Sequence, residues 1–405
     1  MSLPLVSIVI PTHNRSQYAF SCIESLLRIN SDRMEVVVSD TSTSDDLRNR
    51  LTSLDIDASK TRIKYFKPEP PLNMTENHNL AVANARGHFV CLIGDDDTVT
   101  HELIDAAEWA EKNGVDCLSP NIVSNYAWPD FRSRSFGAGH ASRLYLPQRI
   151  GSLKCVEGAK ALAKALDNAG QGTEGLPKLY HGLVRRQVLE EVRRHSGEYF
   201  HGSSPDVSIA VSLAYLLAIR QGSFYTIDYP LTIPGASGGS NTGRSAMNKH
   251  KGELSSEKQT SDFVNSGWSG GVPRFFSVET VWAHACISTL SAWGAVDALH
   301  NYSYSRLLAS CFNAHPEYHN ETNRALEDAA EKMGMPIAKL IMAVKRERMK
   351  LMLRRLRYLA LRALWPTASG GRKFVAGIQC IADTPDVLQS WLDKKNLNFA
   401  KVVSV

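Results

Sequence analysis

The chain has 405 residues, of which 43% are apolar and 21% are charged. This length suits two or three domains of about 150 residues each, and the composition excludes a wholly disordered protein. The formal net charge is only +5, and the segment from Lys345 to Arg362 alone carries +7. The rest of the chain is slightly acidic, which excludes a generally basic protein that coats nucleic acid.

The cysteines and the apolar segments indicate the compartment. The seven cysteines are scattered and never form a Cys-x-x-Cys spacing, which argues against a disulfide framework or a zinc site and suits a reducing environment. No signal-peptide pattern precedes the first strand, which begins near Leu5. The best candidate for a membrane span, Val281–Val296, is short and contains polar residues, so it is better interpreted as a buried helix. We therefore expect a cytoplasmic protein.

The first third of the sequence alternates strands and helices. Helices are predicted over Ser16–Ile29, over Thr75–Arg86 with Thr75 as the N-cap, and from a cap at Thr100 to Asn113. The predicted strands are apolar throughout, which is typical of a parallel sheet covered by helices on both faces. In such a sheet the ligand site is expected at the carboxyl ends of the strands. These strands are Leu5–Pro11, Glu35–Ser39, Arg62–Phe66, His88–Ile93 and Val115–Leu118.

After residue 120 the predicted strands and helices no longer alternate regularly. Helices are predicted over Glu157–Asp167 and Asp206–Ile219, with a strand over Phe224–Ile227. A glycine- and serine-rich segment at 234–243 is either a linker or a flexible lid. After Ser277 the chain is predicted to be helical as far as Trp365, with a last short helix at Pro385–Leu392.

Three acidic positions lie at predicted strand ends or loops: Asp40, the run Asp95–Asp97, and Asp206. Three adjacent carboxylates repel one another, and a divalent cation that also binds a diphosphate would neutralise them. The alternative is a cluster at a helix N-terminus, where the helix dipole favours acids. Asp206 suits either a general base or the N-cap of the following helix.

Four segments together resemble family-2 glycosyltransferases of the GT-A fold. They are VSIVIPTHNR (Val6–Arg15), EVVVSD (Glu35–Asp40), NHNLAVANARGHFVCLIGDDD (Asn77–Asp97) and the later Pro205-Asp206. The resemblance implies an α/β, Rossmann-like GT-A catalytic domain over residues 1–245, with a nucleotide-sugar half at about 1–120 and an acceptor half at about 121–245. A mostly helical C-terminal region would follow over residues 246–405.

The resemblance also implies roles for individual residues. Asp206 is the expected general base, and Asp97 with Asp95 is expected to hold Mn²⁺ or Mg²⁺ against the diphosphate. Asp95 is also expected to contact the ribose or sugar, and Arg244 is the candidate for closing over the diphosphate. His181 and His250 are each either metal or diphosphate contacts or structural histidines. The residues expected to bind the nucleotide donor are Pro11, Thr12, Asn14, Arg15, Asp40, Asn77, Asn79, Asp95 and Asp96.

The expected reaction is the metal-dependent, inverting transfer of one sugar from a nucleotide donor. We expect this donor to be a UDP-linked sugar. The acceptor implied is a glycan or lipid-linked glycan in surface polysaccharide or lipopolysaccharide synthesis. No QxxRW stretch follows Asp206, which argues against a processive synthase. The alternatives are a non-catalytic nucleotide- or glycan-binding module that retains the fold, and a sugar-phosphate nucleotidyltransferase. A nucleotidyltransferase would have a glycine-rich loop with a basic residue directly after the first strand. The sequence at this point, THNRSQ, contains no such loop.

The basic segment Val344–Trp365 has apolar residues at three- and four-residue spacing, with arginines and lysines on the other face. That pattern is typical of a helix lying on an anionic membrane surface, which would place the protein on the inner face of the cytoplasmic membrane. A helix packed on the catalytic domain and a homo-oligomer interface are the alternatives. No nucleic-acid partner is expected.

Overall fold

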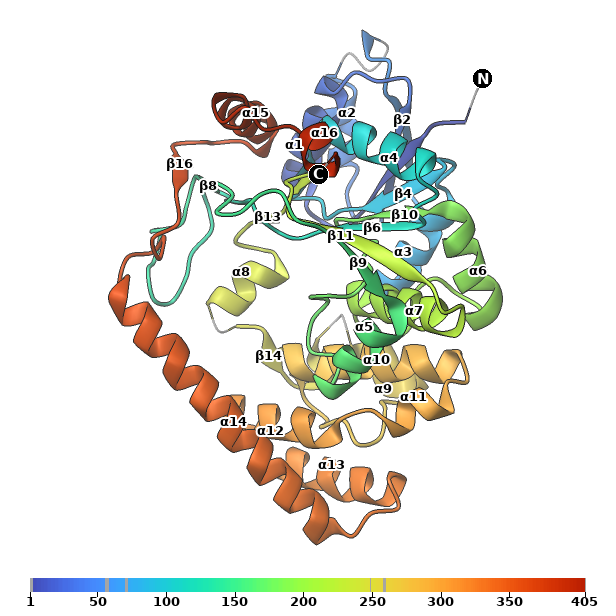
Figure 1. Ribbon diagram of the computed structural model, residues 1–405, viewed down its shortest axis with the longest axis vertical. Helices are drawn as coiled ribbons and strands as arrows, with labels where there is room; N and C mark the ends of the chain where they lie inside the picture. The colour runs from blue at the N-terminus through green and yellow to red at the C-terminus, as the bar shows by residue number, and fades with distance from the viewer. Residues whose placement is uncertain (1–2, 55–57, 70–71, 248, 258–259, 405) are drawn as a thin grey trace.

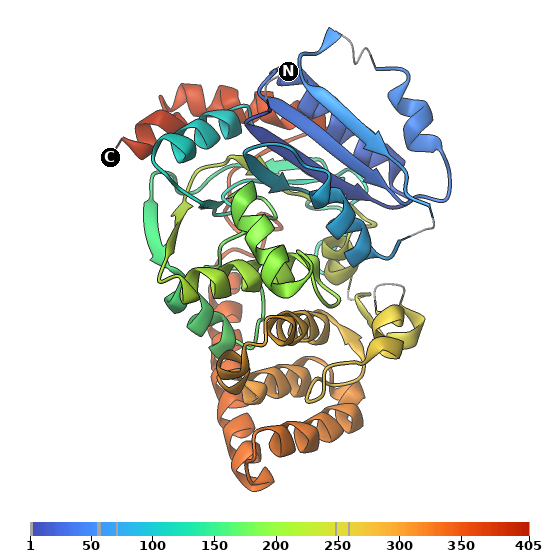
Figure 2. The same cartoon turned by 90° about the vertical axis from the view of Figure 1, so that its right-hand side faces the viewer.

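The computed structural model describes residues 3–54, 58–69, 72–247, 249–257 and 260–404 (Figure 1). Its largest sheet has the strand order β3-β2-β1-β4-β10-β6-β11-β9. Figure 2 shows the blue strands of this sheet at one end of the molecule and the orange C-terminal helices at the other. The strands are β1 (Val6–Thr12), β2 (Met34–Asp40), β3 (Arg62–Phe66), β4 (Phe89–Leu92), β6 (Cys117–Pro120), β9 (Leu153–Glu157), β10 (Leu183–Arg185) and β11 (Ser223–Ile227).

The sheet is mixed: the predicted strands β1, β2, β3, β4, β6 and β11 all run in one direction, as expected, and the strands that run the other way are β9 and β10, which were not predicted. β1 pairs in parallel with β2 and β4, and β2 pairs in parallel with β3. β10 is antiparallel to both β4 and β6, and β9 is antiparallel to β11. The regular strand–helix alternation from which we predicted parallel pairing ends near residue 120, and β10 is only three residues long, too short for a distinct pattern.

The predicted helices of the first half are present, but two of the predicted caps are wrong. α3 (Met74–Ala83) begins one residue before Thr75, because the extended Asn73 accepts a hydrogen bond from the Glu76 amide in a capping box. α4 begins at Glu102, and the Thr100 hydroxyl instead donates to main-chain carbonyls at residues 230 and 231. The helices of this half are α1 (Ser16–Arg28), α2 (Asp46–Leu51), α4 (Glu102–Lys112), α5 (Gly158–Asp167), α6 (Arg186–Ser196) and α7 (Pro205–Ile219).

Short strands lie outside the main sheet. β5 (Thr98–Val99) pairs with β12 (Thr232–Ile233), and β14 (Lys251–Gly252) pairs with β15 (Phe276–Ser277). A second sheet joins β13 (Gly235–Ala236), β7 (Asn125–Ala127), β8 (Arg143–Tyr145) and β16 (Phe374–Ala376). The glycine-rich segment 234–243 therefore contains a strand and leads into α8 (Asn241–Ala246).

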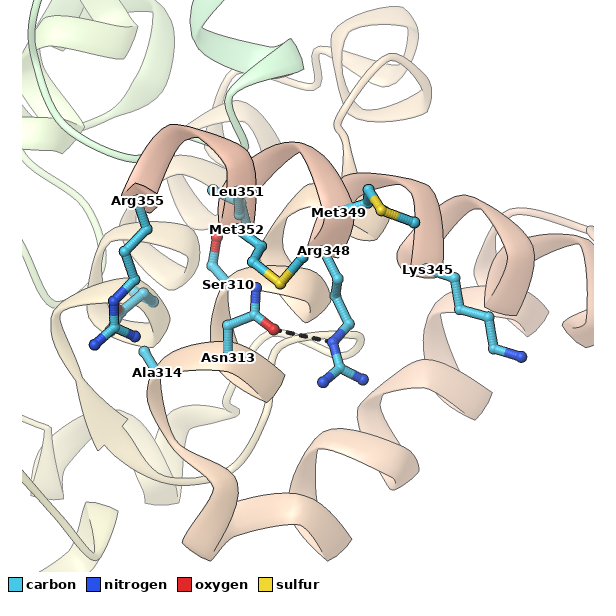
Figure 3. Close-up of a pocket in the computed structure, with 10 residues that line it drawn as sticks. Ser310, Asn313, Ala314, Lys345, Arg348, Met349, Leu351, Met352 and Arg355 are labelled. Atoms are coloured by element: carbon cyan, nitrogen blue, oxygen red, sulfur yellow. Dashed lines mark hydrogen bonds between the residues drawn. The ribbon is translucent and has the colours of Figure 1, made fainter. Parts of the chain in front are cut away.

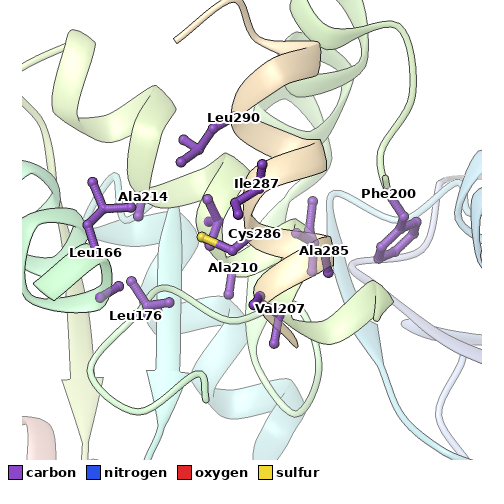
Figure 4. Close-up of a cluster of buried hydrophobic side chains, with 14 of the residues drawn as sticks. Leu166, Leu176, Phe200, Val207, Ala210, Ala214, Ala285, Cys286, Ile287 and Leu290 are labelled. Atoms are coloured by element: carbon purple, nitrogen blue, oxygen red, sulfur yellow. The ribbon is translucent and has the colours of Figure 1, made fainter. Parts of the chain in front are cut away.

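One buried cluster joins the sheet domain to the C-terminal helices. α7 is buried on nearly every side, and it packs against α10 (Val278–Ala292). α10 covers most of the segment Val281–Val296 and is a buried helix, as expected. No helix within the described residues is long and apolar enough to cross a membrane. Figure 4 shows the side chains at this junction, among them Leu166, Leu176, Phe200, Val207, Ala210, Ala214, Ala285, Cys286, Ile287 and Leu290.

The C-terminal region consists mainly of helices, and its end returns to the first half of the chain. α14 is long, and Leu340 and Val344 are its only buried residues in the part of the chain described. A further helix follows the one predicted at Pro385–Leu392, and the Phe399 amide there donates to Glu102 of α4 at 2.9 Å. The predicted domain boundary near residue 245 stays a prediction. These helices are α9 (Ser261–Ser266), α11 (Val296–His300), α12 (Tyr304–Ala314), α13 (His319–Lys332), α14 (Ile337–Leu364), α15 (Thr384–Lys394) and α16 (Phe399–Val403).

Candidate active site

The three consecutive aspartates lie immediately beyond the carboxyl end of β4 and are all buried. Arg15, between β1 and α1, contacts two of them: its Nε lies 3.2 Å from Asp95 Oδ1 and its Nη2 lies 2.9 Å from Asp96 Oδ2. The Thr12 hydroxyl, at the end of β1, donates to Asp95 Oδ2 at 2.7 Å. The chain itself therefore supplies one full positive charge to this acidic cluster, Asp95–Asp97.

Asp97 accepts hydrogen bonds from three separate segments. Both main-chain donors, the amides of Gly94 and Gly235, lie 2.7 Å from its carboxylate oxygens. The Tyr180 hydroxyl donates to Asp97 Oδ2 at 3.1 Å, and His181 Nε2 lies 3.2 Å from the same oxygen. Asp97 is thus the point at which the β4 end, the loop before β10 and the glycine-rich segment meet.

The glycine-rich segment covers the acidic cluster, which favours a covering role over that of a linker. The Ser237 amide and hydroxyl donate to Asp96 Oδ2 at 3.1 and 2.6 Å. Trp128 Nε1 donates to the Asp96 carbonyl at 3.0 Å. A Cβ atom at Gly235 would lie 1.8 Å from that same carbonyl oxygen, so only glycine allows the main chain to approach so closely.

Burial is the largest influence on the pKa values of the acidic cluster. Burial raises the pKa of Asp95 to about 7, although Arg15 opposes the change. Burial and the Asp97 charge also raise the pKa of Asp96. Burial alone would raise the pKa of Asp97, but His181 and the two glycine amides hold it below its ordinary value. Burial would lower the pKa of Arg15, yet its two carboxylate neighbours raise it, so Arg15 stays charged.

The donor set fits a divalent cation in its chemistry, because carboxylates are the ligands that Mg²⁺ and Mn²⁺ prefer. Burial, more than the neighbouring Asp96 charge, raises the pKa of Asp95 despite Arg15, so a cation at this position would favour its ionised form. The side chains do not converge, however: among the described residues there is no group of three or more His, Cys, Asp or Glu side chains arranged to hold a metal. Each carboxylate instead turns toward a different set of protein donors.

The remaining residues expected at the nucleotide lie around the ends of β1 and β2. Asp40 is buried, with one oxygen accepting from the Ser42 amide at 2.8 Å and the other from the Tyr65 hydroxyl at 2.9 Å. Asn77 is buried and accepts from the Ser39 hydroxyl at 2.6 Å. Pro11 is buried in β1, and the exposed Asn14 has a φ of 55°. These side chains share one edge of the sheet, and their roles toward a nucleotide stay predictions.

Asn79 lies on a different face of α3 from Asn77. Its Oδ1 accepts from the amides of Tyr199 and Phe200, both at 3.0 Å, and its Nδ2 donates to the Phe200 carbonyl at 3.1 Å. The Thr75 hydroxyl donates to the Gly202 carbonyl at 2.8 Å. In this structure α3 therefore anchors the segment that leads into α7, and Asn79 acts as an anchor for the loop before Asp206.

Asp206 occupies the first turn of α7, after Pro205, and the N-cap position belongs to Ser204. The alternative interpretation of Asp206, as the N-cap residue of this helix, is therefore wrong. Its Oδ1 accepts from the Val207 amide at 2.8 Å and from the Ser204 hydroxyl. Burial and the charges of Asp97, Asp96, Asp95 and Asp206 all raise the pKa of Tyr180. Tyr180 thus lies within electrostatic reach of both the acidic cluster and Asp206.

Arg244 and His250 lie together, and the structure gives Arg244 another partner. Arg244 Nη2 is 3.0 Å from both carboxylate oxygens of Glu257. The buried His250 packs on the Phe276 ring with a centroid distance of 4.7 Å. The proposed contact of Arg244 with a diphosphate and the role of His250 both stay predictions.

Sequence reasoning missed Tyr180, Gly235, Ser237 and Trp128, which all contact the acidic cluster. His181 was singled out, and it does contact Asp97. Its φ of 63° and its buried, unpaired Nδ1 mark a constrained position. The only local signal for the others was the glycine-rich composition at 234–243.

Comparison with known proteins relates part of this chain to a family of enzymes. The sequence model of glycosyl transferase family 2 matches residues 7–161. A Campylobacter jejuni GalNAc(5)-diNAcBac-PP-undecaprenol beta-1,3-glucosyltransferase is 32% identical over 96 residues, 24% of this chain and 30% of that protein. The putative colanic acid biosynthesis glycosyl transferase WcaA of Escherichia coli is 35% identical over 99 residues, 24% of this chain and 34% of that one. The match to these two relatives thus spans about a third of their length.

Among solved structures, S. aureus TarS 1-349 in complex with UDP-GlcNAc matches 82% of this chain and 92% of that one, with 15% identity and a TM-score of 0.43. The family match and the α/β sheet followed by helices confirm the predicted fold class. Residues 7–161 of this chain are thus similar to the glycosyl transferase family 2 domain.

Proposed function

We propose that this protein transfers a single sugar, with inversion, from a nucleotide-diphosphate donor to a glycan or lipid-linked glycan in surface polysaccharide or lipopolysaccharide synthesis. The observation that supports it most is the pairing of a buried acidic cluster at the carboxyl ends of the strands with a separate carboxylate, Asp206, near Tyr180. The names of the relatives, which concern undecaprenol-linked glycan and colanic acid, support the acceptor class. A UDP-linked donor is part of the proposal.

The donor would lie at the edge formed by β1, β2 and β4. Residues at the ends of β1 and β2 would contact the base and ribose, and Asp97 with Asp95 would hold Mn²⁺ or Mg²⁺. When bound, the cation would offset the negative charge that gathers on the departing nucleoside diphosphate. Arg15 contributes a fixed positive charge on the same side.

Asp206 would act as the general base. The acceptor hydroxyl loses its proton as it attacks the sugar from the face opposite the leaving group, so this carboxylate has to stand apart from the cation. The position of Asp206 on α7, while the acidic cluster follows β4, supports this assignment. The α3 contacts at residues 199–202 fix the segment that positions it.

The Asp206→Asn variant tests this role. Asparagine keeps the size and the hydrogen-bond acceptor but takes no proton, so we expect turnover to fall roughly a hundredfold or more while donor affinity is retained. Asp386→Asn is a matched control, since Asp386 also follows a proline in the first turn of a helix, α15. Initial rates with a UDP-sugar panel, and UDP binding with and without Mn²⁺, give the two readouts. Normal turnover in the Asp206 variant would refute the assignment.

The proposal extends to location. An enzyme that acts on a lipid-linked acceptor works at a membrane surface, and residues 344–365 of α14 combine basic and exposed apolar side chains. We place the protein on the inner face of the cytoplasmic membrane through this segment. Use of the same face for self-association is the competing possibility, and sedimentation velocity distinguishes the two.

A further inference from the structure

α12 and the middle of α14 enclose a groove of about 750 Å³, remote in sequence from the acidic cluster. Figure 3 shows that Arg348, Met352 and Arg355 of α14 and Ser310, Asn313 and Ala314 of α12 lie around it. Lys345, Met349 and Leu351 complete the α14 side, and Glu279 contributes from α10. The groove thus joins a floor of methionine and leucine to a basic border.

The border has more positive than negative charge. Lys345, Arg348 and Arg355 face a single acid, Glu279, which lies 2.8 Å from His315 Nε2. Burial would raise the pKa of Glu279, but His315 holds it below its ordinary value, so this acid is already paired. Arg348 Nε donates to Asn313 at 3.0 Å, which orients its guanidinium beside the groove. Within the described residues Lys345 and Arg355 have no acidic partner.

The apolar floor continues along α14 beyond the groove. Met352, Leu356 and Leu359 are 52%, 54% and 51% exposed, at successive turns of the same side of the helix. Large exposed apolar stripes on a folded protein mark a surface that another apolar body covers. A ligand that fits both parts has a negatively charged group for the groove and a hydrocarbon portion for the stripe.

We propose that this groove binds the phosphate of an anionic phospholipid headgroup, with the exposed stripe of α14 in contact with the acyl region of the bilayer. This goes beyond general attraction to a charged membrane, because it assigns a defined phosphate site to Arg348 and Arg355. A second copy of the chain fits less well, since pairing two α14 helices would bring their arginines together.

The experiment compares two pairs of arginines on one helix. Arg348→Gln with Arg355→Gln removes two charges that border the groove, and Arg354→Gln with Arg357→Gln removes two charges outside it. Partition of the full-length protein onto phosphatidylcholine vesicles containing 30% phosphatidylglycerol is measured by sedimentation. We expect the groove pair to lose at least tenfold more affinity than the control pair. Arg355→Gln alone breaks no described hydrogen bond, so it controls for misfolding of the groove pair. This single variant should still show most of the extra loss of vesicle affinity that separates the groove pair from the control pair.

Equal losses in the two pairs would overturn the phosphate site and leave only non-specific attraction. Wild-type protein that stays in the supernatant, or that dimerises through α14 without vesicles, would overturn membrane docking altogether. Sugar transfer to a short water-dispersed acceptor analogue should be unchanged in both pairs. That readout separates failure of the lipid site from failure of the proposed glycosyltransferase activity.

Discussion

The acidic cluster after β4 and the C-terminal half of α14 present charge in opposite ways. Asp95, Asp96 and Asp97 are buried, and together they contact the end of β1, the loop before β10 and the glycine-rich segment. The arginines of α14 beyond residue 352 lie on an exposed helix whose apolar side chains are also exposed. A buried charge is thus tied to the fold, while an exposed charge is available to whatever binds there.

Removing Asp97 should give the largest effect and break the buried side of this comparison. In Asp97→Ala the amides of Gly94 and Gly235, with Tyr180 and His181, lose their common acceptor. We expect a loss of about 3–5 kcal/mol in the free energy of unfolding, together with loss of sugar transfer and of Mn²⁺-dependent stabilisation by UDP. Urea unfolding and thermal shift measure these effects.

Asp116→Ala is the control for that change, since Asp116 forms a partly exposed ion pair with Arg185. Its cost should stay within about 1 kcal/mol. Full activity of wild-type protein in excess EDTA would contradict the metal part of the proposal without affecting the stability result.

Asn79→Ala tests the connection between α3 and the segment before Asp206, with a smaller effect. The substitution leaves the Tyr199 and Phe200 amides without their acceptor. We expect about 1–3 kcal/mol of destabilisation and a fall in kcat with UDP affinity unchanged. If UDP affinity fell and kcat did not, Asn79 would be a nucleotide contact after all.

The partly buried His78 side chain should make the stability of the fold depend on pH. We expect this effect to be similar to or smaller than that of Asn79→Ala. Burial lowers the pKa of His78 to about 4, whereas an unfolded histidine titrates near 6.5. Between these values the unfolded chain binds more protons, so stability falls as the pH falls, by about 2 kcal/mol at pH 5 relative to pH 8. Because burial also lowers the pKa of His250 and His284 to about 4, His78→Gln should reduce but not abolish the dependence of Tm on pH over this window, and His300→Gln, at an exposed position, should leave it unchanged.

The smallest effect is expected on the exposed side of the comparison. Arg354→Gln with Arg357→Gln should change the free energy of unfolding by no more than about 0.5 kcal/mol, because both side chains are exposed on α14. Urea denaturation checks this value. A larger loss would show that this part of α14 is packed against another element.

The strands and helices of the first half were predictable from the sequence because their signals are local. The apolar runs that form β1, β2, β3 and β4 lie within one or two residues of their predicted bounds. The acidic positions were also evident, since three consecutive aspartates after an apolar run are unusual in themselves.

The partners of these acids were not predictable, because they come from far along the chain. Tyr180 is 83 residues from Asp97, and Ser237 is 141 residues from Asp96, so no spacing rule connects them. The orientation of β10 depends on the same long-range packing. The amphipathic pattern of α14 was visible in the sequence, but the groove also needs Ser310 and Asn313 of α12.

The contact of α16 with α4 has a consequence for how the chain reaches its folded state. Glu102 accepts from the Phe399 amide and from the Tyr229 hydroxyl, and Trp109 packs on the Phe399 ring. During synthesis, at roughly 5–20 residues per second, α4 emerges long before residue 399 exists. The outer face of α4 therefore stays open until residue 399 has been synthesised, so the first half of the chain completes its packing only after that point.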